Sequence, residues 1–261
     1  MNDTTTPAGL FDLAGTRAAV VGGTGVLGGQ FARCLAAAGA TVTVLGRSTE
    51  RGEAVVEEIR GGGGHAAFVP VDVETRASVE EAAGVLAAEG GLDILVNAPG
   101  VNSSTPFAEI TDDEWHKLLD VNLTAVFRTC QAFSPLMRNR LAGASIINIS
   151  SASSGPPLSR VFGYGVAKAG VNNATQYLAR ELAPDGIRVN AILPGFFPAE
   201  QNRRLLTTER IDSIVSHTPM QRLGTSEELD GTLLWLASSR ASGFVTGALV
   251  RVDGGFSAMT I

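Results

Sequence analysis

Tyr164 and Lys168 are the residues of this chain best suited to acid–base chemistry. Both residue types are rare: the only tyrosines are Tyr164 and Tyr177, and the only lysines are Lys117 and Lys168. In a helix, a spacing of four places two side chains on the same face. A nearby ammonium stabilises a phenolate and lowers the pKa of the phenol. The pair therefore predicts a phenol that protonates a substrate oxygen as a ketone is reduced, or accepts the proton in the oxidation.

Ser151 stands thirteen residues before Tyr164, at the end of an apolar, strand-like run over residues 145–150. At the carboxyl end of a parallel strand, its hydroxyl would face the cleft in which open α/β sheets bind ligands. There it could hydrogen-bond the substrate oxygen. Taken singly, Ser151 could instead cap the strand end, and Lys168 could be a solvated helix charge.

A glycine-rich segment follows the first apolar run of the chain. It reads GGTGVLGG over residues 22–29 and contains the pattern GxGxxG at Gly23, Gly25 and Gly28. Glycines permit a tight turn and let backbone N–H groups approach a pyrophosphate at the N-terminus of the next helix. Because the segment lies between a predicted strand and a predicted helix, it indicates a dinucleotide-binding loop.

The end of the second predicted strand distinguishes between the two nicotinamide dinucleotides. A site for NAD generally places an acidic residue there to accept a hydrogen bond from the ribose 2′-hydroxyl. This chain has Leu45-Gly46-Arg47-Ser48 instead. Arg47 and Ser48 could bind a 2′-phosphate, so NADP(H) is favoured over NAD(H). The alternative is that Arg47 is only a solvated loop charge.

The elements that must position these residues follow from the alternation of short apolar runs with segments whose apolar residues recur at helical spacing. The predicted strands are residues 17–22, 41–45, 66–71, 93–97, 145–150, 187–193 and 248–252. The predicted helices are residues 26–38, 49–60, 76–89, 111–140, 162–182 and 226–238. The order predicts an α/β fold, a Rossmann-type doubly wound parallel sheet of about seven strands with helices on both faces. We expect a single domain over residues 1–261, with a mobile substrate loop or small helical insert at about 196–222.

Composition excludes several other classes of protein. A net charge of −6 and a pI near 5.1 argue against nucleic-acid binding. The cysteines and histidines lack the spacing of metal ligands, so no metal site is predicted. No stretch approaches the roughly 18 consecutive apolar residues of a membrane span, and the N-terminus does not resemble a signal peptide. We therefore expect a cytoplasmic protein.

Taken together, the motifs resemble the classical, single-domain short-chain dehydrogenases/reductases over essentially the whole chain. The resemblance is carried by the glycine loop, Asp72-Val73, Asn97-Ala98-Pro99-Gly100, DVNLTAVF, NISSAS, YGVAK, RVNAILPG and FVTGALVRVDGG. It implies a catalytic tetrad of Asn122, Ser151, Tyr164 and Lys168. In this tetrad Tyr164 is the acid–base and Ser151 orients the carbonyl. Lys168 binds the nicotinamide ribose and tunes Tyr164, and Asn122 anchors a water that links Lys168 to solvent.

The same resemblance implies a set of cofactor contacts along the strand ends. They are Gly22, Thr24, Gly25, Val26, Leu27, Gly28, Arg47, Ser48, Asp72, Val73, Asn97, Ala98, Gly100, Tyr164, Lys168, Pro194, Gly195 and Phe197. The chain departs from the family pattern at Val21, where threonine is usual, and at Val26, where the loop usually has its middle glycine. Pro99 removes a backbone donor, and Ala199 stands where a threonine often contacts the cofactor.

The segments before Tyr164 and after Pro194 are similar to those of reductases acting on sugar acids such as fructuronate. Because a guanidinium suits a carboxylate, Arg160 and Arg203 are candidates, with Ser153, for binding a polyhydroxylated or carboxylated ketone. Arg160 could instead pair with a surface acid. The resemblance also implies a homotetramer or homodimer. Two alternatives to the ketone/alcohol oxidoreductase stay open: an epimerase or dehydratase that recycles its nucleotide, and a non-catalytic nucleotide-binding sensor on the same fold.

Overall fold

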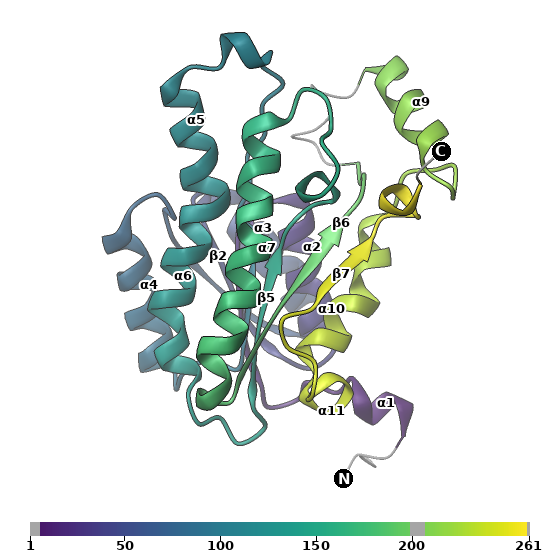
Figure 1. The fold of residues 1–261 in the computed structure, drawn as a ribbon. Coiled ribbons are helices and arrows are strands. Elements are labelled where there is room, and N and C mark those ends of the chain that lie inside the picture. The colour runs from purple at the N-terminus through teal and green to yellow at the C-terminus, as the bar shows by residue number, and fades with distance from the viewer. Residues whose placement is uncertain (1–5, 199–206, 260–261) are drawn as a thin grey trace.

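A seven-stranded parallel sheet forms the centre of the protein (Figure 1). The computed structural model describes residues 6–198 and 207–259. The strand order is β3-β2-β1-β4-β5-β6-β7, and every neighbouring pair is parallel. The strands are β1 (Arg17–Val21), β2 (Thr41–Gly46), β3 (His65–Pro70), β4 (Ile94–Asn97), β5 (Ala144–Ile149), β6 (Ile187–Pro194) and β7 (Leu249–Val252). This is the predicted Rossmann-type sheet.

Helices cover both faces of the sheet. On one face lie α4 (Arg76–Ala88), α5 (Asp112–Leu119), α6 (Ala125–Phe133) and α7 (Phe162–Leu182), and on the other α2 (Val26–Ala37), α3 (Thr49–Gly61) and α10 (Asp230–Ala237). The helices α1 (Pro7–Leu10) and α11 (Ser239–Ser242) are short, and α9 (Thr208–His217) lies beyond the carboxyl ends of β6 and β7 (Figure 1).

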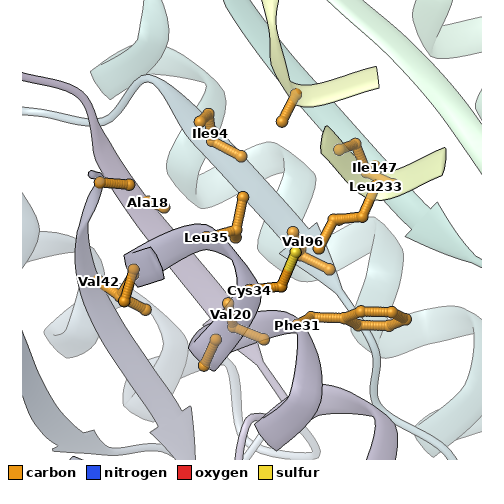
Figure 2. Close-up of a cluster of buried hydrophobic side chains, with 14 of the residues drawn as sticks. Ala18, Val20, Phe31, Cys34, Leu35, Val42, Ile94, Val96, Ile147 and Leu233 are labelled. Carbon is orange, nitrogen blue, oxygen red and sulfur yellow. The ribbon is translucent and has the colours of Figure 1, made fainter. Parts of the chain in front are cut away.

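Successive residues of the central strands contribute to two separate hydrophobic cores. In β1, Ala18 and Val20 join the cluster under α2, α3 and α10, whereas Ala19 and Val21 join the cluster under α4, α6 and α7. Figure 2 shows the first cluster, in which Phe31 of α2 lies near the strand residues. Because both faces are covered, the strands are continuously apolar, which is the pattern that made them visible in the sequence.

Capping residues set the start of two of the helices near the site. The Ser48 hydroxyl accepts a hydrogen bond from the Arg51 amide at 3.4 Å and so caps α3. Thr111 accepts from the Glu114 amide at 3.2 Å and caps α5, whose first turn carries three acids. A hydroxyl at the N-cap accepts a hydrogen bond from an amide that has no partner inside the helix. The acids in the first turn interact favourably with the positive end of the helix dipole.

The predicted helix over 111–140 is interrupted, which corrects its expected length. Between α5 and α6 the chain makes a π turn at Asp120–Thr124, and after α6 it tightens into a 3₁₀ turn at Ser134–Met137 that contains a proline. The predicted helix over 226–238 likewise begins as a 3₁₀ turn, Ser226–Leu229, before α10. Such turns depend on tertiary contacts that helical periodicity does not encode.

The chain leaves the sheet after β7 and forms a helical insert after β6. The predicted strand over 248–252 is confirmed as β7, which ends at Val252; Gly254 and Gly255 then take φ values of +62° and +87° and turn the chain away. The insert after β6 is helical at α9, as one of the two predictions for this segment allowed. Among the described residues, no helix is long and apolar enough to cross a membrane, and no three potential metal ligands cluster.

Candidate active site

A cleft opens at the carboxyl ends of β1, β4, β5 and β6, where the residues predicted to do chemistry meet. It encloses about 960 Å³ of empty space, open solvent included. Its lining includes Gly22, Gly25, Val26, Leu27, Gly28, Ala98, Gly100, Ser151, Ser153, Tyr164, Lys168, Pro194, Gly195 and Phe197, all predicted site residues. Parallel strands direct their carboxyl ends to one edge, and the loops there create this cleft.

Tyr164 projects from the first turns of α7 toward Ser151, which follows β5. Burial raises the pKa of the Tyr164 phenol above its usual value, and a side-chain hydrogen bond with Ser151 lowers it in part. The Ser151 hydroxyl also accepts a hydrogen bond from the Ser153 amide at 3.1 Å. The sequence predicted a lowered pKa for this phenol. That prediction is wrong, because the cost of desolvating the phenolate outweighs the hydrogen bond with Ser151. The phenol is therefore protonated at neutral pH.

Lys168 is buried beside Tyr164, with 2% of its surface exposed. Its ammonium donates to the carbonyl of Ile149 at 2.9 Å and, more weakly, to that of Pro99 at 3.4 Å. It lies 5.7 Å from the centroid of the Tyr164 ring. Burial lowers the pKa of Lys168 from 10.5 to about 8. The solvated helix charge allowed by the sequence is thus excluded, because this cation is enclosed at the base of the cleft.

The glycine loop forms a cradle in which side chains would have no room. A Cβ on Gly28 would lie 2.2 Å from the Gly22 carbonyl oxygen, and one on Gly22, whose φ is +76°, would lie 2.6 Å from the carbonyl oxygen of Ala98. Gly25 is the N-cap of α2 and has no side chain to occupy the helix N-terminus. This leaves backbone N–H groups open to an anion, so the residues fit the pyrophosphate of a dinucleotide. Val26, in place of the usual glycine, lines the cleft at the first turn of α2.

Comparisons with known proteins agree with this geometry. Residues 24–257 match the family model described as enoyl-(acyl carrier protein) reductase. The chain belongs to the short-chain dehydrogenase/reductase family. As a member, it is an NAD(P)-dependent oxidoreductase.

Three relatives of this dehydrogenase/reductase are informative. It is 40% identical to the uncharacterized oxidoreductase UxuB of Bacillus subtilis strain 168, covering 95% of this chain and 96% of the relative. It is 35% identical to the 5-keto-D-gluconate 5-reductase of Escherichia coli K12, covering 94% and 97%. The crystal structure of a gluconate 5-dehydrogenase from Burkholderia cenocepacia J2315, in complex with NADP and tartrate, is 33% identical, with a TM-score of 0.93 and coverage of 98% and 100%.

The dehydrogenase/reductase cleft continues past the glycine loop to the end of β2, where it would take the adenosine of a dinucleotide; this is called the adenosine end. A second groove shares Gly22, Gly25 and residues 98–101 with the first, so the two form one continuous channel. Besides the shared residues, this end is lined by three more predicted cofactor residues, namely Thr24, Arg47 and Val73. Sequence reasoning missed Arg51 and Glu74, which line it as well. The only sequence signal for Glu74 was its place directly after the third strand and Asp72-Val73.

Four predicted site residues do not line the cleft and instead form hydrogen bonds with other groups of the protein. Ser48 caps α3. Asp72 accepts a hydrogen bond from the Glu74 amide at 3.1 Å and so shapes the turn after β3. The side chain of Asn97 donates to Asn148 at 2.9 Å inside the sheet. Contacts of these residues with the cofactor stay predictions.

Asn122 is the fourth of these residues and lies in the π turn. Its side-chain amide donates to the carbonyls of Val101 and Leu118, each at 2.9 Å, and its oxygen accepts from the Val101 amide at 3.2 Å. The side chain thus joins the loop after β4 to the end of α5. Both N–H groups of its amide are bonded to backbone carbonyls. A catalytic part for Asn122 stays a prediction.

The substrate edge of the cleft is the loop between Ser151 and α7. Ser153 lines the cleft, but Arg160 is exposed, has φ +65° and does not line it. Arg160 makes no hydrogen bond or ion pair with another described residue. Arg203 and Ala199 lie outside the described residues. Sequence reasoning missed Arg210 of α9, which donates to the Ser159 carbonyl at 2.9 Å and to its hydroxyl at 3.2 Å.

Proposed function

We propose that this protein is an NADP(H)-dependent oxidoreductase that interconverts a ketone and a secondary alcohol on a carboxylated, polyhydroxylated substrate. The observation that carries the proposal is the arrangement of Ser151, Tyr164 and Lys168 at one end of a glycine-lined dinucleotide cleft.

The chain's own residues account for the proton in this reaction. When bound, the nicotinamide supplies a hydride to the carbonyl carbon or accepts it from the alcohol carbon. Ser151 orients the substrate oxygen, and Tyr164 donates its phenol proton to that oxygen as the ketone is reduced. In the oxidation Tyr164 takes the proton. Lys168, a cation at neutral pH, would hold the nicotinamide ribose beside the phenol.

The choice of NADP(H) is supported by the adenosine end of the cleft. Arg47 lines it, and Gly46 precedes Arg47 at the end of β2, where a NAD site usually has its acid. A Cβ on Gly46 would lie 2.6 Å from the Thr24 side chain, so this position has no room for a larger residue. The related gluconate 5-dehydrogenase structure contains NADP.

The choice of substrate is supported by the relatives and by the substrate edge. Two of the relatives reported above are named for gluconate or its keto derivative. An unpaired guanidinium at Arg160 is suited to the carboxylate of such a substrate. Arg203, outside the described residues, is the second candidate.

The test is turnover with NADPH and with NADH across keto sugar acids, including 5-keto-D-gluconate, and matched keto sugars without a carboxylate. We expect NADPH with a keto acid to give the highest kcat/KM. Tyr164→Phe should lower kcat at least about 100-fold, because the ring is kept and the proton donor is lost. Tyr177→Phe is the matched control, since Tyr177 is 62% exposed and far from the cleft lining. Equal turnover by Tyr164→Phe would refute the mechanism.

Arg160→Ala tests recognition of the carboxylate. We expect its KM for the best keto acid to rise about tenfold, the cost of losing one charged hydrogen bond, with little change for the carboxylate-free sugar. Arg180→Ala, an exposed arginine in the last turn of α7, is the control and should change neither KM. Unchanged KM values in Arg160→Ala would refute this role.

A further inference from the structure

We propose that Lys117 and Glu74 determine cofactor specificity together with Arg47: Lys117 neutralises the Glu74 carboxylate so that Arg47 is free to bind the 2′-phosphate of NADP(H). The inference rests on the proposed preference for NADP(H) and deepens it. It assigns a positioning role to Lys117, the lysine that lies on α5 and outside the catalytic group.

The three side chains form one ion-pair network at the adenosine end of the cleft. The Lys117 ammonium lies 2.6 Å from each oxygen of the Glu74 carboxylate. The Arg47 guanidinium lies 3.3 Å from one of those oxygens. Glu74 therefore has two cationic partners, and the contact with Lys117 is the shorter. Arg47 thus pairs with an anion that lines the same groove.

The backbone keeps Glu74 at this position. The Asp72 carboxylate accepts a hydrogen bond from the Glu74 amide at 3.1 Å, and Arg128 donates to the carbonyl of Val73 at 3.1 Å. The Glu74 side chain is 24% exposed, so it is partly enclosed by the groove and its partners. Glu74 is therefore anchored through its backbone at the wall of the groove, and Lys117 and Arg47 hold its carboxylate.

A 2′-phosphate and an unpaired carboxylate at one end of a groove repel each other. The phosphate also competes with Glu74 for Arg47, because both anions suit the same guanidinium. With Lys117 in place, Glu74 keeps a cation of its own when Arg47 turns to the phosphate. NAD(H) carries an uncharged 2′-hydroxyl, so this repulsion does not apply to it. Lys117 therefore favours NADP(H) selectively.

The experiment measures dissociation constants of NADPH and NADH for the full-length protein by fluorescence titration. Lys117→Met should weaken NADPH about five- to tenfold, as expected for an uncompensated charge near a phosphate in water, and change NADH less than about twofold. Lys117→Arg keeps the cation and should retain the NADPH affinity. The double variant Glu74→Gln/Lys117→Met removes the carboxylate as well and should restore NADPH affinity.

Arg138→Met is the matched charge control. It also removes one cation from an ion pair, with Asp185, but neither residue lines the groove. We expect no change in either dissociation constant. The NADH affinity of Lys117→Met reports whether the variant is folded.

The possible failures are distinguishable. A wild-type protein that binds NADH more tightly than NADPH overturns the proposed cofactor preference, and this inference with it. A wild type that prefers NADPH, with Lys117→Met unchanged, overturns the inference alone. Equal weakening of both cofactors, or a double variant that stays weak, shows a structural role for Lys117 and also overturns it.

Discussion

The chemistry of Lys168 depends on its burial beside Tyr164. It is a cation enclosed in protein, with two backbone carbonyls as its partners. Burial disfavours the charged form, so the pKa of Lys168 falls to about 8, whereas burial raises the pKa of the neighbouring phenol of Tyr164. The two shifts have the same cause and opposite signs, because one group is charged when protonated and the other when deprotonated.

These shifts predict how ketone reduction depends on pH. Lys168 is charged below pH 8 and loses its proton as the pH rises through 8, while Tyr164, with its raised pKa, stays protonated in this range. We expect kcat/KM for reduction to be level near neutral pH and to fall above about pH 8. The pH profile of kcat/KM with saturating NADPH measures this. A profile that stays level to pH 10 would contradict the part assigned to Lys168.

At the scale of elements, the turn from β1 into α2 determines how closely the chain approaches the cofactor. Gly28 lies in the first turn of α2, directly against the Gly22 carbonyl. Both partners are backbone, so neither can move aside as a side chain would. The glycine loop therefore works as one rigid unit with the start of the helix.

Gly28→Ala tests that unit. A Cβ placed 2.2 Å from the Gly22 oxygen should force the loop apart, lower the free energy of unfolding by about 2–3 kcal/mol and weaken NADPH binding strongly. Gly84→Ala in α4 is the control, because no atom lies within 4 Å of its Cβ position. It should stabilise the protein by about 0.5–1 kcal/mol. Chemical unfolding and fluorescence titration give both quantities, and a Gly28→Ala variant with wild-type affinity would refute the close approach.

Across the whole molecule, the two ends of the sheet have different tasks. The carboxyl ends of the strands hold the cleft, whereas the amino ends are closed by contacts that serve stability. Asp93, just before β4, accepts hydrogen bonds from Arg140 at 2.5 and 3.1 Å and from the Arg17 amide at 2.9 Å. It joins three segments at the end of the sheet opposite the cleft.

Asp93→Asn should therefore affect stability without affecting catalysis. We expect the free energy of unfolding to fall by about 2 kcal/mol, because a buried, charge-assisted set of hydrogen bonds is lost, while kcat/KM stays the same. Asp185→Asn, which breaks the more exposed pair with Arg138, should cost less than about 0.5 kcal/mol. Urea unfolding and steady-state assays measure both. A large loss of activity in stable Asp93→Asn protein would contradict this division.

Local patterns were sufficient for the sheet and for the central residues of the site. The strand boundaries agree to within about two residues, because strands covered on both faces are continuously apolar. Tyr164, Lys168, Ser151 and the glycine loop were visible because their spacing within single segments places them at strand ends or on one helix face. These features depend on neighbours in the chain, so the sequence contains them directly.

Other features depend on residues that are distant in the chain and become neighbours only on folding. Asn122 bonds to Val101, and Asn97 bonds to Asn148, whose register opposite it comes from the pairing of β4 with β5. The pKa of Tyr164 depends on burial, which no spacing of residues expresses. Glu74 and Lys117 meet across 43 positions of sequence. Composition and local pattern determine which elements form and which groups they carry, whereas packing determines which groups are desolvated and which charges are paired, because both depend on contacts between separate segments.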